Sequence, residues 1–237
     1  MANSKTFILS TRPVGEAALS KALKYGMVIE EISFIETEED IDDSKTKKIK
    51  ELSGRKNSVV FTSMNAVEAV GKIASEIHNW KIYCIGNTTK KLVEKYFGKK
   101  NIAGTADNAS QLVDTIVSDS SIKKIVFFCG DKRRDELPEK LRENKIEVED
   151  IEVYKTIETP QQLSKEYDGV LFFSPSAVKS FFSKNKIGSV TKLFAIGNST
   201  AKEINNFTNQ SIIIADKPGK ENLVDLAIKH FSKSHIL

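Results

Sequence analysis

Short runs of apolar residues alternate along the chain with longer stretches in which apolar residues recur every three or four positions. The first pattern is typical of buried strands and the second of amphipathic helices. Their alternation favours an α/β fold with doubly wound parallel sheets. The pattern predicts ten strands, at 6–11, 28–34, 58–62, 81–86, 101–104, 124–129, 147–154, 169–173, 192–197 and 211–215. It predicts eight helices, at 14–25, 65–77, 87–97, 109–118, 134–144, 176–184, 199–206 and 221–232.

Residues 59–116 recur at 170–227, so the spacing between the two copies is 111 positions. The matching residues include Val59 and Val170, Phe61 and Phe172, Ser63 and Ser174, Ile85 and Ile196, Gly86 and Gly197, Asn87 and Asn198, Thr89 and Thr200, and Leu112 and Leu223. A repeated unit of this length has the size of a domain. The chain is therefore predicted to hold two copies of one α/β module with about five strands each. A cleft between two such lobes is where a ligand is expected.

The beginnings of the two copies match less closely, near residues 6 and 124. The first copy carries extra residues in the charged stretch 36–57. This stretch and the segment 154–160 are the natural places for the chain to cross from one lobe to the other. If both cross, each lobe takes its first two strands from one copy and its last three from the other. The strand pattern satisfies the swapped and the unswapped arrangement equally.

The composition is that of an ordinary globular protein, with 237 residues, 40% hydrophobic and 29% charged. No apolar run approaches the length of a membrane span, and the first residues lead into a strand without the pattern of a signal peptide. Cys84 and Cys129 each end an apolar strand pattern, which favours buried, reduced thiols. These features predict a cytoplasmic protein with no membrane partner.

The net charge of +4 is small but unevenly distributed. The segment 30–43 holds eight acidic residues and no basic one, and 45–56 then holds six basic residues and one acidic residue. This pattern is interpreted as a solvated connection between the lobes. Basic residues interleaved with aromatic ones, the pattern of a nucleic-acid site, are not found. No nucleic-acid partner is therefore expected, whereas a small polyanionic ligand suits the balance of charge.

The common catalytic and cofactor motifs are missing from the sequence: it has no G-x-G-x-x-G, no phosphate-binding G-x-x-x-x-G-K, no G-x-S-x-G and no C-x-x-C. The three histidines are His78, His230 and His235. His230 and His235 are five residues apart, which is poor spacing for one face of a helix. No metal site and no histidine-based catalytic triad are predicted.

Four strand-to-helix turns are instead rich in small hydroxyl and amide residues. The candidates for substrate binding in these turns are Thr62, Ser63, Asn65, Asn87, Thr89, Ser174, Ser176, Asn198 and Thr200. Taken singly, each turn is explained by N-capping of the helix that follows. Taken together, they lie at the carboxyl ends of parallel strands, where doubly wound sheets bind ligands and where helix N-termini favour anions. The recurrence of four such turns, paired by the duplication, shifts the balance from capping alone toward ligand binding.

Three cationic side chains follow strands in the same way. Arg12 follows the first strand, Arg134 follows the sixth strand with Arg133 beside it, and Lys220 opens the last helix. Each is a candidate for contact with an anionic ligand, with solvent exposure as the alternative. Tyr154 ends the strand predicted at 147–154, at a proposed crossing. Its hydroxyl could donate a proton or a hydrogen bond to a leaving oxygen, or the ring could simply pack at a hinge.

These residues together resemble the uroporphyrinogen-III synthase family over about residues 6–230. The resemblance rests on Thr11-Arg12-Pro13, Phe61-Thr62-Ser63-x-Asn65-Ala66-Val67, Ile85-Gly86-Asn87-x-Thr89, Val153-Tyr154-x-Thr156, Phe173-Ser174-Pro175-Ser176-Ala177-Val178 and Ala195-Ile196-Gly197-x-x-Thr200-Ala201. No single motif is specific, and the ordered set carries the resemblance. Met64 departs mildly from the family pattern, in which proline or alanine is commoner.

The resemblance implies two α/β lobes joined by a two-stranded linker, with residues 1–36 and 156–237 in lobe one, 37–155 in lobe two and the active site in the cleft between them. It implies an enzyme that converts hydroxymethylbilane, a linear tetrapyrrole with eight carboxylates, into uroporphyrinogen III. Water is lost, the fourth ring is inverted and the macrocycle closes, without cofactor or metal. A monomer is expected, and a transient contact with the enzyme that produces the bilane is left open.

The resemblance also matches Tyr154 to the family tyrosine that is suspected of helping the hydroxyl group leave. Two other functions compete with the synthase. One is a non-catalytic bilobal protein that binds an anionic metabolite, for which a phenol at position 154 has no evident use. The other is a nucleotide-sugar enzyme with two similar lobes, which would require carboxylates or a glycine-rich loop at the strand ends.

Overall fold

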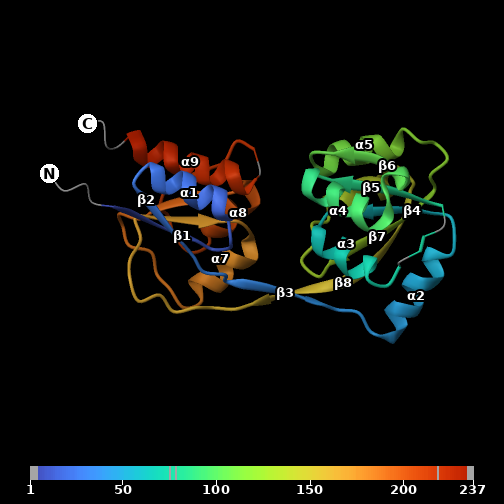
Figure 1. The fold of residues 1–237 in the computed structure, drawn as a ribbon, viewed down its shortest axis with the longest axis horizontal. Coiled ribbons are helices and arrows are strands. Elements are labelled where there is room, and N and C mark those ends of the chain that lie inside the picture. Colours follow the sequence, from blue (N-terminus) through green and yellow to red (C-terminus); the bar gives the residue numbers. More distant parts are fainter. Residues whose placement is uncertain (1–4, 75, 78, 218, 234–237) are drawn as a thin grey trace. The chain divides into compact units, whose positions relative to one another are not determined.

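The computed structural model describes residues 5–74, 76–77, 79–217 and 219–233. The chain divides into two compact units (Figure 1). Unit 1 is formed by Met1–Glu36 together with Ile157–Leu237, and unit 2 by Thr37–Thr156. Each unit therefore has its own sheet and its own hydrophobic core, and unit 1 is discontinuous in sequence.

Unit 1 contains a parallel sheet of five strands in the order β11-β10-β9-β1-β2. Its strands are β1 (Thr6–Ser10), β2 (Met27–Glu31), β9 (Gly169–Phe172), β10 (Lys192–Ala195) and β11 (Ile212–Ile214). Its helices are α1 (Glu16–Lys24), α7 (Pro175–Phe182), α8 (Asn198–Ile204) and α9 (Lys220–Lys233). Buried residues of α1 and α9 pack on one face of the sheet, and those of α7 and α8 pack on the other.

Unit 2 contains a sheet of six strands in the order β3-β8-β7-β4-β5-β6. Its strands are β3 (Ile35–Glu39), β4 (Asn57–Phe61), β5 (Trp80–Ile85), β6 (Ile102–Ala106), β7 (Lys124–Gly130) and β8 (Glu147–Glu158). Its helices are α2 (Asp43–Ser53), α3 (Met64–Gly71), α4 (Asn87–Phe97), α5 (Ala109–Val117) and α6 (Glu136–Glu143), with a 3₁₀ turn at Lys99–Asn101. β4 to β8 pair with parallel neighbours.

Strand alternation explains both cores of unit 2. Phe61 and Phe128 lie on the face that α2, α3 and α4 cover, and their rings stack with centroids 5.5 Å apart. Phe127 points to the opposite face, where it packs with buried residues of α5 and α6. Successive side chains of a strand point to opposite faces, so a strand buried on both faces is apolar throughout. This is why the runs at 58–62 and 124–129 could be recognised in the sequence.

The two sheets have the same order once the added strand β3 is set aside. In unit 1, β1 and β2 lie beside β9, β10 and β11; in unit 2, β7 and β8 lie beside β4, β5 and β6. The first two strands of one sequence copy thus share a sheet with the last three strands of the other. The predicted fold class, two similar parallel-sheet lobes that are discontinuous in sequence, is confirmed.

The charged stretch 36–57 contains more regular structure than the sequence pattern predicts. It forms most of β3 and the whole of α2, where a solvated connection was expected. Asp42 caps α2 by accepting a hydrogen bond from Lys45 N at 2.7 Å, and the buried Ile49 and Leu52 attach the helix to the core. Strand β3 adds to the edge of the sheet by pairing with β8, and the chain runs between the units along these two strands.

Candidate active site

The turn that follows β4 holds three of the predicted site residues. Ser63 is the N-cap of α3, and its Oγ accepts a hydrogen bond from Ala66 N at 3.3 Å. Thr62 and Asn65, on either side of it, are half-buried. The capping role expected of this turn is thus present, and it places the Ser63 hydroxyl at the carboxyl end of β4.

Tyr154 lies at this same end of the sheet, and a bulge in β8 sets the face of the sheet on which its ring packs. Residues of β7 and β8 pair in register up to Cys129 and Glu152, but Gly130 then pairs with Tyr154, so Val153 is an extra residue. Strict alternation would place Tyr154 on the sheet face of Val148, yet it packs with Ile151 and Val153 on the other face. Bulges occur next to active sites, where they change the direction of a side chain. Here the bulge turns the Tyr154 ring toward the α3 face.

The Tyr154 ring lies directly on Gly130. A Cβ atom on Gly130 would be 2.4 Å from the Cε2 and Cζ atoms of that ring, so only glycine leaves room for it. Burial raises the pKa of the Tyr154 phenol, a hydrogen bond with the Ser63 side chain acts in the opposite direction, and the nearby charge of Asp131 adds to the rise. The phenol is therefore protonated at neutral pH and can act as a donor.

The remaining predicted site residues of unit 2 follow β5 and β7. Asn87 is the first residue of α4, and its side chain lies outside the described residues, whereas Thr89 is buried in the first turn. The helix follows Gly86, which has a φ of 78° and provides no side-chain cap. Arg134 is exposed in the turn between β7 and α6. Its neighbour Arg133 forms ion pairs with Asp135 and, at 3.5 Å, with Asp150.

Unit 1 presents the corresponding turns after β9 and β10. Ser174 caps α7 by accepting a hydrogen bond from Ala177 N at 3.1 Å, and Ser176 is half-buried in the first turn. Asn198, the first residue of α8, is exposed. Thr200 is fully buried, and its Oγ1 has no hydrogen-bond partner among the described residues. An orphaned hydroxyl of this kind is unusual in a native core.

Two cationic side chains lie at the same edge of unit 1. The Arg12 guanidinium lies over the ring of Phe173, 5.9 Å from its centroid, and Lys220 Nζ donates to the backbone oxygen of Pro13 at 3.3 Å. Within the described part of the chain, no carboxylate lies within ion-pair distance of either. Both side chains are exposed. They can therefore bind an anion without first breaking an ion pair with a carboxylate of the described residues.

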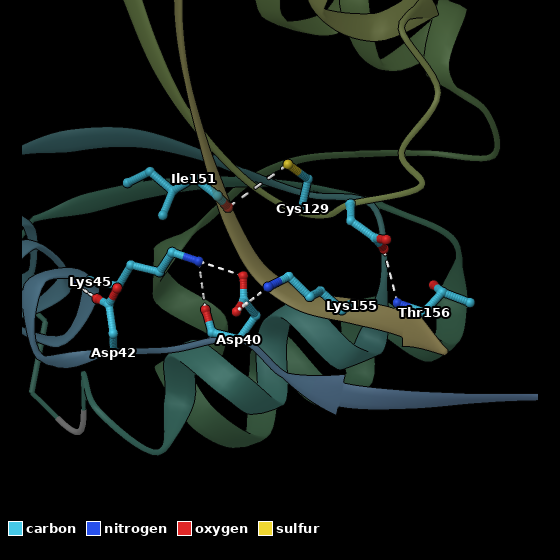
Figure 2. A network of polar contacts seen from close by, with 8 residues as sticks. Asp40, Asp42, Lys45, Cys129, Ile151, Lys155 and Thr156 are labelled. Carbon is cyan, nitrogen blue, oxygen red and sulfur yellow. Dashed lines mark hydrogen bonds and ion pairs between the residues drawn. The ribbon is translucent and has the colours of Figure 1, made fainter. Parts of the chain in front are cut away.

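Next to the site, β3 and β8 are joined by a network of charges (Figure 2). Asp40 accepts hydrogen bonds from Lys45 Nζ at 2.7 Å and from Lys155 Nζ at 2.8 Å. The bond from Lys155 and then that from Lys45 hold the pKa of the Asp40 carboxyl below its usual value. On the other side, Thr156 N donates to Asp131 Oδ1 at 2.9 Å. The segment immediately after Tyr154 is thus bonded on one side through the Lys155 side chain and on the other through the backbone of Thr156.

Among the described residues, no group of three or more His, Cys, Asp or Glu side chains is arranged to hold a metal ion. His78 and His235 lie outside these residues. A small recess of about 220 Å³ lies at the carboxyl ends of β5 and β6 and is lined by Gly86 and Asp107. Larger recesses of about 340 and 380 Å³ lie at the amino ends of the strands, on the edge of each sheet opposite the predicted site.

These features define an α/β protein whose two units each carry hydroxyl-rich turns at the carboxyl edge of a parallel sheet, and unit 2 adds the half-buried phenol of Tyr154. A model of the family described as uroporphyrinogen-III synthase HemD matches residues 17–225. The chain therefore belongs to the uroporphyrinogen-III synthase family. The family resemblance noted in the sequence is confirmed.

Individual relatives agree with this assignment. The uroporphyrinogen-III synthase of Saccharomyces cerevisiae is 26% identical over 205 residues, which cover 71% of this chain and 74% of the relative. The crystal structure of uroporphyrinogen-III synthetase from Helicobacter pylori matches with a TM-score of 0.62 at 17% identity, over 95% of this chain and 99% of that one. A mutant uroporphyrinogen-III synthase from Thermus thermophilus matches with a TM-score of 0.63 at 15% identity, over 96% and 99%. At these identities the two structures support the fold.

The family assignment also decides between the functions that the sequence left open. As a member of this family, the chain is an enzyme, a cyclising lyase that acts in heme synthesis on a small-molecule tetrapyrrole substrate. The non-catalytic binding protein is not favoured. No helix within the described ranges is both long and apolar enough to cross a membrane.

Proposed function

We propose that the carboxyl-edge turns of both units bind one molecule of hydroxymethylbilane and that Tyr154 assists the loss of its hydroxyl group. The observation that carries the proposal is the half-buried, protonated phenol of Tyr154, which packs on Gly130 beside Ser63 at the carboxyl edge of unit 2. The substrate is a chain of four pyrrole rings with eight carboxylates. Binding must therefore neutralise many negative charges and also fix one folded conformation.

The residues proposed to bind these carboxylates combine hydroxyl, amide and cationic groups. Arg12 and Lys220 of unit 1 offer positive charge without a carboxylate partner among the described residues. The turns at Ser174, Ser176, Asn198 and Thr200 in unit 1, and at Thr62, Ser63, Asn65, Asn87, Thr89 and Arg134 in unit 2, offer hydrogen-bond donors. Helix N-termini add backbone N–H groups and a favourable dipole for anions.

The chemical step proposed for Tyr154 is general acid catalysis. The phenol donates its proton to the hydroxyl of the bilane, which leaves as water and yields an azafulvene cation. The substituted carbon of the fourth ring then attacks this cation, and the spiro intermediate that forms rearranges to the inverted isomer with loss of a proton, which restores the phenol. Unassisted closure gives the symmetric isomer I, so control of conformation is the main task of the protein. No cofactor is required by this sequence of steps.

The experiment that tests the proposal is a coupled assay in which hydroxymethylbilane is generated in place, the products are oxidised and the porphyrin isomers are resolved. Tyr154→Phe is expected to lower kcat by about 10²–10⁴-fold, the usual contribution of a general acid, while the product stays isomer III. Wild-type turnover by this variant would remove Tyr154 from the mechanism. Variants Arg12→Ala and Lys220→Ala are expected to raise KM and leave isomer III as the product.

The setting proposed for this enzyme is that of a cytoplasmic monomer, with no nucleic-acid or membrane partner and at most a transient contact with the bilane-producing enzyme. The two free, buried cysteines support a reducing compartment. Light scattering on the purified protein tests the oligomeric state: a molar mass near 26.4 kDa is expected, and a stable dimer would overturn that part.

A further inference from the structure

Asp131 is bonded to the backbone of β8 on both sides of Lys155. Its N–H donates to the carbonyl oxygen of Tyr154 at 3.2 Å. Its Oδ1 accepts from Thr156 N at 2.9 Å, the bond drawn at Thr156 in Figure 2. A single residue thus fixes the peptide group that follows Tyr154 and the one that follows Lys155. The two bonds begin at the first residue beyond β7.

The position of Asp131 explains why a side chain is needed there. Strand β7 ends at Gly130, and the chain turns away, with Arg133 N donating to Gly130 O at 3.2 Å. Strand β8 continues to Glu158, so Thr156 N points toward a neighbour that no longer runs beside it. The Asp131 carboxylate provides the acceptor that the next backbone carbonyl of β7 would otherwise have provided. Without it, a partly buried N–H would lack a partner, which is unfavourable.

The register shift makes this support more important. The extra residue Val153 interrupts the regular ladder between β7 and β8 just before Tyr154, and Gly130, which pairs with Tyr154, is the last residue of β7 in the ladder. On the opposite edge of β8, strand β3 pairs with it, and Lys155 Nζ donates to Asp40 Oδ1 at 2.8 Å. On the β7 side, the bonds with Asp131 therefore hold the peptide groups that follow Tyr154 and Lys155.

We propose that Asp131 is a positioning residue for Tyr154, holding the β8 backbone so that the phenol stays over Gly130 and beside Ser63. This inference rests on the proposed role of Tyr154 in the loss of the hydroxyl group. Asp131 itself need not touch the substrate. A displacement of a reacting group by about 1 Å can cost about 10²-fold in rate, so loosening this clamp lowers kcat.

Replacing Asp131 with asparagine removes the negative charge but keeps the shape of the side chain, so the two contributions can be measured separately. Asp131→Asn keeps an oxygen that can accept from Thr156 N, whereas Asp131→Ala removes it. The matched control is Asp168→Ala in unit 1, because Asp168 Oδ2 likewise accepts from a strand N–H, that of Phe7, at 2.7 Å. That bond lies at the amino ends of β1 and β9, opposite the site.

The test measures kcat, KM and the unfolding midpoint for these variants, alone and combined with Tyr154→Phe. We expect Asp131→Ala to lower kcat by about 10- to 100-fold with KM nearly unchanged, and Asp131→Asn to retain most of the activity. In the Tyr154→Phe background, Asp131→Ala should have little further effect, because the two residues act through one group. Asp168→Ala should keep the wild-type kcat.

Two outcomes would overturn the inference and leave the role of Tyr154 intact. One is an equal effect of Asp131→Ala on kcat with and without the tyrosine hydroxyl. The other is a folded Asp131→Asn variant as slow as Tyr154→Phe, and this variant decides the matter if the alanine variant does not fold. If Tyr154→Phe alone has wild-type kcat, the proposed function fails first, and the inference falls with it.

Discussion

The two units have the same strand order, and in each a carboxylate links the same turn to the same strand. In unit 1 the carboxylate comes from the strand, whereas in unit 2 it comes from the turn. In unit 1, Glu31 at the end of β2 reaches back to the turn after β1, where its Oε1 accepts from Val14 N at 2.6 Å and Gly15 N at 3.3 Å. In unit 2, Asp131 in the turn after β7 reaches forward to Thr156 in β8. Both carboxylates join the turn after the first strand of a copy to the second strand.

The consequence for function differs between the units. In unit 1, β2 ends at Glu31 and its ladder with β1 has no register shift. In unit 2, β8 runs on, contains the bulge, and carries Tyr154 on the strand that the carboxylate holds. The comparison indicates that the carboxylate of unit 1 stabilises a turn, whereas that of unit 2 also positions a reactive group. One duplicated architecture thus provides binding turns twice and a proton donor once.

The largest effect is expected when the ring of Tyr154 is pushed out of place. Gly130→Ala puts a methyl group within 2.4 Å of the ring, which must then move. We expect kcat to fall by about 10²-fold, comparable with the loss from a misplaced catalytic group. The matched control is Gly54→Ala, because a Cβ on Gly54 comes no closer than 3.7 Å to a neighbour. Equal kcat values for the two variants, measured in the isomer assay, would contradict the positioning of the ring by Gly130.

Much of the structure that the two units share could be predicted from the sequence, because its central strands are buried. Strands such as Asn57–Phe61 and Lys124–Gly130 are covered on both faces, so their apolar runs stand out. The hydroxyl-rich turns could be placed because each follows such a run. The repeat at a spacing of 111 residues then predicted two similar sheets.

The parts that were not predicted depend on partners distant in the sequence. Strand β3 is exposed at almost every position, so it has no apolar pattern, and it exists because β8 lies beside it. Helix α2 buries few apolar side chains, although its cap at Asp42 and the glycine that ends it were visible signals. No feature of the β8 sequence indicates the bulge at Val153. Only the Gly130-Asp131 pair after a strong strand could have suggested a close approach.

A smaller effect, confined to stability, is expected from the carboxylate of unit 1. Glu31→Ala leaves the N–H groups of Val14 and Gly15 without this acceptor, which should cost about 1 kcal/mol and lower the unfolding midpoint by about 2–4 °C. The value of kcat should stay unchanged, in contrast to Asp131→Ala. Glu31→Gln, which keeps the acceptor, should recover most of the stability. A loss of kcat in Glu31→Ala without a shift in the midpoint would remove the distinction between the units.

The buried hydroxyl of Thr200 is expected to show opposite effects on stability and binding. Because its Oγ1 has no partner among the described residues, Thr200→Val removes an unsatisfied polar group and should stabilise the free enzyme by about 1 kcal/mol. If a substrate carboxylate is the missing partner, KM should rise by about 10-fold. Thr191→Val is the control, since Thr191 Oγ1 donates to Tyr167 O at 2.8 Å and its loss should be destabilising. An unchanged KM for Thr200→Val would exclude this hydroxyl from substrate binding.

The smallest effect concerns alkaline pH, and it should be confined to unit 2, which holds both cysteines. Burial raises the pKa of the Cys84 thiol to about 11 and that of Cys129 to about 12, from a normal value near 9. The folded state therefore binds these protons more tightly than the unfolded state does, so their contribution to stability is complete below pH 9 and declines as the pH rises toward 11–12.

Trp80, which is buried in unit 2 and is the sole tryptophan of the sequence, reports the unfolding of that unit by fluorescence. Urea unfolding followed in this way should show a lower midpoint at pH 9.5 than at pH 8. In the double variant Cys84→Ala/Cys129→Ala, the difference between the midpoints at these two pH values should be smaller, whatever the stability of the variant itself. An equal pH dependence of the midpoint in both proteins would mean that the thiols do not make the stability of unit 2 more sensitive to alkaline pH than that of unit 1.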